Sequence, residues 1–254
     1  NSTLTRPQDA AIINASNGES SYSFLSYIGR VNYDFAGRYL VSMSYRADGS
    51  SRFGPENRWG YFPAVSLGWV ISDENFFAPI GNALTFFKMR LSYGLVGNSE
   101  IGDYSYLSTY ATSTYNANTG LGLANVGDDK LGWETTSQLN VGISFELFQG
   151  RISGEVDYYN KTTKDLLLPF PVSQMSGVSL VTKNAGTLTN KGYDMMLSSV
   201  NIDVNSFQWS TSVTLNYNEN RVTSLGDELI ENGISASQGL GSISIFPGYP
   251  VGVN

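Results

Sequence analysis

Neither cysteine nor histidine occurs among the 254 residues of this sequence. Their absence excludes a disulfide framework, a Cys/His zinc site and any catalysis that depends on histidine. Charged residues are also scarce, at 15% against about 25% in a typical soluble domain. The net charge is −7 and no broad Lys/Arg patch exists, which argues against nucleic acid as a partner. No run of about 18 apolar residues is present, so a transmembrane helix is excluded.

What the chain does have is alternation of apolar and polar residues. From Phe207 to Tyr217 the odd positions are mostly apolar, with aromatics at both tips, and the even positions are small and polar. This period of two is typical of a β-strand with two different faces. The same pattern predicts eight strands, over residues 22–35, 38–46, 61–71, 84–96, 133–147, 151–160, 190–200 and 207–217, and a ninth opening near Ser242.

The connections between these strands differ in length in a regular way. Those near residues 36, 149 and 204 are short and the one near 77 is moderate, with room for one helical turn, whereas 47–60, 97–132 and 161–189 are expected to be long loops. In an antiparallel sheet this puts short turns on one rim and long loops on the other, as in outer-membrane barrels. The fold class predicted is therefore all-β, an antiparallel transmembrane β-barrel segment of eight or nine strands. A soluble β-sandwich is the alternative.

Several sequence blocks resemble one family of such barrels. Residues 30–35 read RVNYDF, 46–54 read RADGSSRFG, 57–64 read NRWGYFPA and 154–168 read GEVDYYNKTTKDLLL. Together with Gly68-Trp69, KMRLSYG at 88–94 and WETT at 133–136, these blocks are similar to the SusC/RagA family, the TonB-dependent outer-membrane transporters of Bacteroidetes.

The resemblance implies a barrel of about 22 strands with an N-terminal plug. Residues 1–254 are then expected to be part of a single TonB-dependent receptor barrel domain, with the plug, the TonB-engaging motif and the other strands outside this sequence. It further implies an importer, not an enzyme, located in the cell outer membrane. Its partners would be lipid, TonB and a SusD-like lipoprotein, and its cargo an oligosaccharide or a peptide. No cofactor is expected. A surface adhesin or carbohydrate-binding β-domain without transport is the rival hypothesis.

Two groups of residues are candidates for function in the loops. The first is a charge cluster in a Gly/Ser-rich loop, made of Arg46, Asp48, Arg52 and Arg58. Paired Arg and Asp side chains can fasten such a loop by charge-assisted hydrogen bonds, and the alternative is contact with substrate or plug. The second is a set of four tyrosines in the loop 97–132, namely Tyr104, Tyr106, Tyr110 and Tyr115. They would contact a partner lipoprotein or a glycan, or else pack over the barrel mouth.

Two pairs of carboxylates are candidates for a catalytic or a metal site. Glu155 and Asp157 lie two residues apart and so face the same side of one strand. They would suit a glycosidase only with a facing partner in a cleft, and a hydrated lumen lining is favoured. Asp128-Asp129 has no further carboxylate at calcium-loop spacing before it, so a solvated turn is favoured over a metal site.

Overall fold

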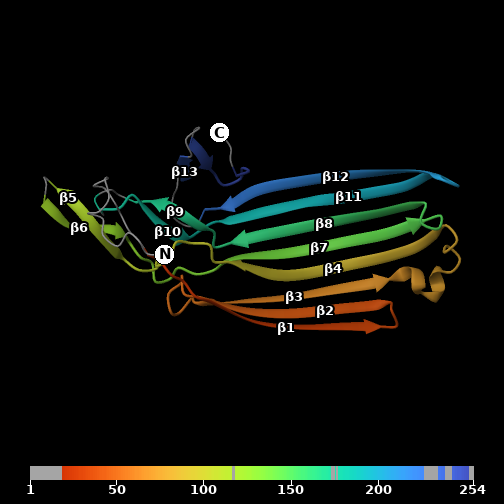
Figure 1. The fold of residues 1–254 in the computed structure, drawn as a ribbon, viewed down its shortest axis with the longest axis horizontal. Coiled ribbons are helices and arrows are strands. Elements are labelled where there is room, and N and C mark those ends of the chain that lie inside the picture. The colour runs from red at the N-terminus through yellow and green to blue at the C-terminus, as the bar shows by residue number, and fades with distance from the viewer. Residues whose placement is uncertain are drawn as a thin grey trace.

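Eight long strands form one antiparallel sheet in the computed structural model, which describes residues 19–115, 118–172, 175, 177–225, 234–237 and 242–251. In spatial order they are β1 (Phe24–Phe35), β2 (Tyr39–Ser50), β3 (Trp59–Val70), β4 (Leu84–Asn98), β7 (Glu134–Leu147), β8 (Ile152–Lys164), β11 (Thr187–Val204) and β12 (Phe207–Ser224). The all-β antiparallel prediction is confirmed (Figure 1). Within the described residues, no helical segment has the length and apolarity needed to cross a membrane.

The two ends of the sheet differ as the connection lengths indicate. The hairpin turns β1–β2, β7–β8 and β11–β12 lie at one end, here called the short-turn rim, and the long connections lie at the other, the loop rim (Figure 1). The first turn uses Ala36 and Gly37 at φ of 56° and 69°, a left-handed pair that suits a two-strand hairpin. Also at the short-turn rim, the β3–β4 connection forms two 3₁₀ turns, η2 (Ile71–Asp73) and η3 (Asn75–Phe77).

The loop rim contains more regular structure than the sequence indicates. Residues expected to be loop form two separate hairpins, β5 (Thr109–Tyr115) with β6 (Asn118–Asn125) and β9 (Leu167–Pro171) with β10 (Leu180–Asn184). β5 and β6 consist mainly of small residues without clear alternation. β9 reads LLPFP, and its two prolines and lack of polar residues hide the strand, although Phe170 and the opposite Val181 are buried. A strand does begin at Ser242, but β14 (Ser242–Ile245) pairs with β13 (Ile234–Ser237) and not with β12, so it is no ninth strand of the main sheet.

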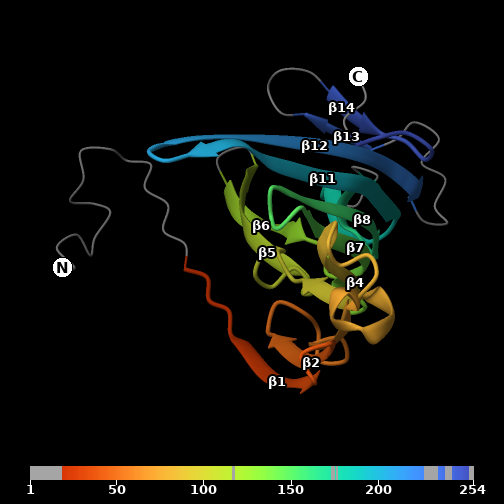
Figure 2. The ribbon, with the colours of Figure 1, turned by 90° about the vertical axis from the view of Figure 1, so that its right-hand side faces the viewer.

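The main sheet is curved, and its faces differ in chemistry (Figure 2). Residues that stand opposite one another on neighbouring strands form rows across the sheet, and all members of a row lie on one face. One row is Tyr33, Val41, Leu67, Leu91, Val141, Tyr158, Tyr193 and Tyr217. The next is Phe35, Tyr39, Trp69, Met89, Ile143, Val156, Met195 and Leu215. These two rows form an apolar band across the convex face.

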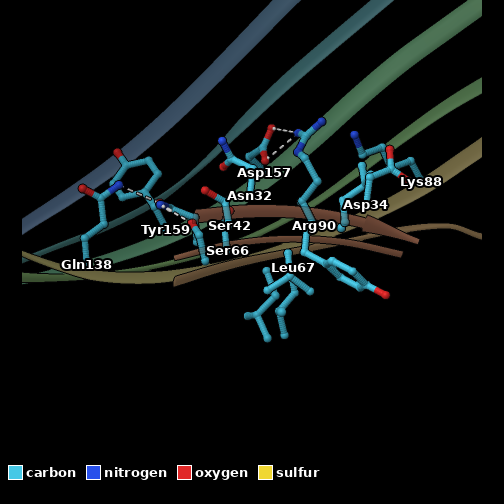
Figure 3. Close-up of a pocket in the computed structure, with 18 of the residues that line it drawn as sticks. Asn32, Asp34, Ser42, Ser66, Leu67, Lys88, Arg90, Gln138, Asp157 and Tyr159 are labelled. Atoms are coloured by element: carbon cyan, nitrogen blue, oxygen red, sulfur yellow. Dashed lines mark hydrogen bonds and ion pairs between the residues drawn. The ribbon is translucent and has the colours of Figure 1, made fainter. Parts of the chain in front are cut away.

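This apolar face is not a packed interior. Leu67, Val141 and Val213 expose 45%, 37% and 49% of their surface, which agrees with side chains that face lipid. Figure 3 shows Leu67 on the opposite side of the strands from Ser42 and Ser66. A β-sandwich would instead bury such residues against a second sheet. The sandwich alternative therefore fails for the main sheet.

Candidate functional site on the concave face and the loop rim

A row of small and polar residues crosses the middle of the concave face. It consists of Asn32, Ser42, Ser66, Ser92, Asn140, Tyr159, Gly192 and Asn218. Hydrogen bonds run along it: Asn140 Nδ2 donates to Ser92 Oγ at 3.2 Å, and the Tyr159 hydroxyl donates to Asn218 Oδ1 at 3.1 Å. The tyrosine ring lies over Gly192, where a Cβ would come within 2.6 Å of the hydroxyl oxygen. This row is a hydrogen-bonding surface, as expected for a wall that faces water.

The adjacent row carries charges. From β1 to β12 it reads Asp34, Leu40, Gly68, Arg90, Gly142, Asp157, Asp194 and Asn216, and it is called the charged row below. Arg90 stands between two glycines, so its side chain can lie along the sheet and reach over β7. Its Nη2 donates to Asp157 Oδ1 at 2.9 Å (Figure 3). The same nitrogen also contacts the Glu155 carboxylate, while Nη1 donates to Ser144 Oγ at 2.5 Å.

Both members of the predicted carboxylate pair, Glu155 and Asp157, thus form ion pairs with the same arginine. Glu155 and Asp157 both accept hydrogen bonds from Arg90, and they do not face each other across a cleft. That arrangement has the geometry of an ion-pair network and lacks the opposed acid and base that glycoside hydrolysis requires. Sequence reasoning placed both acids on the polar face but did not find Arg90 as their partner, since 65 residues separate Arg90 from Glu155.

Both rows line a hollow of about 830 Å³ on the concave face. Its lining includes cations and anions, with Lys88, Arg90 and Lys161 close to Asp34, Asp157 and Asp194. Lys161 Nζ lies 5.2 Å from the centre of the Tyr159 ring, a cation–π distance. The surface is therefore suited to contact polar groups of either charge sign and not an apolar ligand.

The loop rim holds the predicted charge cluster, but its members do not form one network. Arg46 Nε is 2.6 Å from Asp48 Oδ2, and Asp48 is buried. Arg52 instead pairs with Asp103 of the next loop, Nε to Oδ1 at 2.9 Å, and its guanidinium lies 4.0 Å from the centre of the Tyr22 ring. For Arg58, the buried Nε has no hydrogen-bond partner among the described residues.

A cluster of rings beside these charges connects the loops. Trp133 contacts Phe24, Phe53 and Phe62 at centroid distances of 6.1, 5.2 and 5.4 Å. Phe53 and Leu131 are fully buried at 0% exposure. This group, the rim core, joins β1, the β2–β3 loop and the segment before β7. The motif RADGSSRFG contains Phe53, yet sequence reasoning concentrated on its charges and missed the ring as the packing element.

The four predicted tyrosines occupy different parts of the β4–β7 connection, two before β5 and two on it. Tyr104 has a left-handed φ of 64° and its hydroxyl is 3.2 Å from Ser21 Oγ. Tyr110 lies on β5 with 67% of its surface exposed. Tyr106, which lies between Tyr104 and Tyr110 in the sequence, is partly buried. Tyr115 ends β5, and its side chain lies outside the described part of the structure. Their role in binding stays a prediction.

Metal ligands were also considered in the loop that contains Asp128 and Asp129. Asp128 Oδ1 accepts a hydrogen bond from the Lys130 backbone amide at 3.0 Å, a local turn. Among the residues that the structure describes, no group of three or more carboxylates, histidines or cysteines is close enough to hold a metal ion.

A curved antiparallel sheet with an exposed apolar convex face, a polar concave face and loops that are long on one rim is the wall of a membrane β-barrel. A family model described as "TonB dependent receptor-like, beta-barrel" matches residues 2–242. The chain belongs to this family, whose members are outer-membrane β-barrel proteins.

Named relatives are similar over most of the chain. TonB-dependent receptor P39 of Formosa agariphila is 40% identical over 225 residues, which cover 85% of this chain and 22% of the relative. TonB-dependent receptor SusC of Bacteroides thetaiotaomicron is 34% identical over 248 residues, covering 92% of this chain and 24% of the relative. The chain therefore spans about a quarter of the length of these relatives.

Solved structures agree with the sequence relatives. A structure of the RagAB peptide transporter superposes with a TM-score of 0.81 at 30% identity, over 99% of this chain and 28% of that chain. A RagAB peptide importer in a closed-closed state gives a TM-score of 0.79 at 32% identity, over 91% and 25%. The siderophore receptor PirA of Pseudomonas aeruginosa, at 15% identity and a TM-score of 0.53, shares the fold alone. The predicted resemblance to SusC and RagA is confirmed.

Proposed function

We propose that this chain is a section of the barrel wall of a SusC-like, TonB-dependent nutrient importer in the outer membrane. The observation that carries this proposal is the division of the sheet into two faces. Two neighbouring rows are apolar on the convex side, and two rows on the concave side consist mainly of polar, charged or glycine residues, across all eight strands. In a bilayer the convex face contacts lipid, while the concave rows line a hydrated lumen through which cargo passes.

The cargo we propose is an oligosaccharide or a peptide, taken up with a SusD-like lipoprotein on the loop rim and with energy delivered through TonB. Support comes from the likeness to SusC and to the RagAB peptide importer. The hollow on the concave face, with hydrogen-bonding groups and charges of both signs, supports a polar cargo. The exposed tyrosines of the β4–β7 connection, and Tyr110 above all, are the proposed contacts with cargo or lipoprotein.

The proposal is tested with the full-length gene in its own organism. A clean deletion should abolish growth on one class of nutrient while leaving growth on monosaccharides or free amino acids unchanged, and re-expression should restore growth. Separate cultures on oligosaccharides and on peptides distinguish the two cargo classes. Recovery of the full-length protein in the soluble periplasmic fraction would reject the importer and favour the adhesin hypothesis.

A matched pair of variants tests the mechanism inside the barrel. Ser66→Trp would fill the concave surface beside Ser92, whereas Leu67→Trp places the same ring on the convex face. We expect the first substitution to slow uptake and the second to leave uptake unchanged at equal surface abundance. The reverse result would contradict the assignment of the faces.

A further inference from the structure

The β3–β4 connection at the short-turn rim turns toward the convex side of the sheet. Phe76 packs edge-on against Trp69 at a centroid distance of 6.4 Å, and Phe77 stacks on Phe87 at 6.4 Å with an interplanar angle of 7°. Trp69 and Phe87 both belong to the apolar convex face. Seen along the strands, the coiled segment after β3 lies on the outer side of the arc (Figure 2). The connection is thus an extension of the lipid-facing surface.

Two of its exposed side chains are large and apolar, beside the exposed polar residues Asp73 and Asn75. Phe76 and Ile80 expose 64% and 56% of their surface, while Phe77 beneath them is buried. The stretch 71–83 contains no lysine or arginine. Polar residues suffice for a turn that lies in water. A single exposed apolar side chain is nevertheless common on protein surfaces and does not by itself indicate a binding site. Here, however, Phe76 packs on Trp69 of the apolar convex face, and Ile80 lies in the same connection four residues later.

One carboxylate holds this segment in place. Glu74 lies between the two 3₁₀ turns, and its Oε1 accepts hydrogen bonds from the Tyr39 hydroxyl at 2.5 Å and from Trp69 Nε1 at 3.1 Å. Its Oε2 accepts from Arg38 Nη1 at 3.0 Å. Three donors from β2, β3 and the β1–β2 turn therefore fix the connection against the strand ends.

We infer that residues 71–83 form a lipid-binding anchor, which inserts Phe76 and Ile80 into the boundary between head groups and acyl chains of the bilayer leaflet at the short-turn rim. The occupant of this surface is phospholipid, because Phe76 and Phe77 pack directly on Trp69 and Phe87 of the convex face that the proposed function places in lipid. Aromatic side chains with a polar partner, such as Trp69 bonded to Glu74, favour the same depth. The inference rests on the proposed membrane-spanning function and adds a specific contact to it.

The experiment is a depth measurement by spin labelling on the full-length protein, with any other cysteine replaced, in vesicles of phosphatidylethanolamine and phosphatidylglycerol. Labels are placed at Phe76→Cys and Ile80→Cys. Leu67→Cys is the control on the convex strand face, and Gln149→Cys, on the exposed β7–β8 turn of the same rim, is the control in water. Collisions with oxygen, which partitions into lipid, are compared with collisions with a water-soluble nickel complex.

We expect the oxygen-to-nickel ratio at positions 76 and 80 to lie several-fold above that at 149 and below that at 67. Ratios at 76 and 80 equal to the ratio at 149, with 67 still deep, would overturn the anchor and leave the importer proposal standing. Protection of position 76 from both reagents would overturn it in favour of a protein contact. A ratio at 67 as low as that at 149 would instead reject the membrane-spanning function itself.

Discussion

Arg90 on β4 reaches across β7 to Asp157 on β8, and the distance from Nη2 to Oδ1 is 2.9 Å. The residue between them is Gly142, which pairs with both. A Cβ at this position would lie 2.0 Å from the Asp157 oxygen and 2.9 Å from the arginine nitrogen. The absence of a side chain on the central strand is therefore what allows the ion pair to form.

Loss of the cation should cost more than loss of one anion in this network. Arg90→Met leaves two carboxylates close together, whereas Asp157→Asn leaves Glu155 available to the arginine. Since the Arg90 and Asp157 side chains are 35% and 31% exposed, we expect a loss of about 1 kcal/mol for Arg90→Met and less for Asp157→Asn. Urea unfolding of the full-length protein in lipid vesicles measures both, and equal losses would contradict a shared role of Arg90.

Arginine substitutions at neighbouring positions of β2 test which face of the sheet contacts lipid and which lines the lumen. Val41 lies in a convex apolar row and Ser42 in the small polar row. If Val41 lies near the bilayer midplane, Val41→Arg should cost about 2–4 kcal/mol, and Ser42→Arg much less. Free energies of folding into vesicles give the comparison. Similar costs for the two variants would argue against the assignment of faces.

Position 192 requires glycine because the Tyr217 backbone and the Tyr159 ring both lie close to it. A Cβ there would stand 2.1 Å from the Tyr217 carbonyl oxygen and 2.6 Å from the Tyr159 hydroxyl. Because a strand backbone cannot yield as a flexible side chain does, we expect Gly192→Ala to cost about 1–3 kcal/mol. At Gly29 nothing lies within 4 Å of the added atom, so Gly29→Ala should be close to neutral. Unfolding midpoints of both variants provide the test.

The rim core should control the order of the loops more than the stability of the sheet. Phe53 is fully buried against Trp133, and Phe53→Ala removes a packing contribution of about 3–5 kcal/mol. We expect faster protease cleavage in the loop-rim segments on intact cells, with the strands still protected. Leu121→Ala, at a residue with 78% exposure in the β5–β6 hairpin, is the control and should leave cleavage unchanged.

Acid should release the β3–β4 connection. The hydrogen bond from the Tyr39 hydroxyl, followed by those from Trp69 and Arg38, holds the pKa of the Glu74 carboxyl below its ordinary value. A lowered folded-state pKa stabilises the native state above the unfolded-state pKa of about 4.3, and this contribution is lost as pH falls through the folded value. Glu74→Gln should therefore be less stable than the parent at neutral pH, with a smaller difference at about pH 3.

Urea midpoints at the two pH values measure this difference. Glu56→Gln, at an exposed carboxylate on the loop rim, controls for the removal of one negative charge. A gap between parent and Glu74→Gln that widened on acidification would contradict the proposed hydrogen-bond set.

The membrane strands were readable from sequence because each has two different surroundings. Val41 and Ser42, or Val213 and Thr214, must alternate when one face meets lipid and the other water. Even Met196, which breaks the alternation of its strand, lies in a concave row opposite Glu155 and Thr214. The hairpin β5–β6 was missed because its small residues do not alternate, and β9–β10 because the prolines of β9 and its lack of polar residues hide its buried side.

The contacts of the candidate site were less accessible to sequence reasoning. Local pairing found Arg46 with Asp48, two residues apart, but not Arg52 with Asp103, which are 51 residues apart. Long-range partners depend on strand order, and the order places β4 beside β7, not beside the hairpin that follows β4 in sequence. Arg90 is likewise far in sequence from its two acids, 65 residues from Glu155 and 67 from Asp157.

The row structure has a consequence for assembly of the wall. A shift of β7 by a single position would move Asn140 to the lipid-facing side and Val141 to the lumen, since side chains alternate strictly. The same shift of β8 would move Asp157 into lipid. Each strand that has paired in the correct register therefore disfavours a shifted register in its neighbour. The alternation of residues along the strands thus specifies the register during membrane insertion.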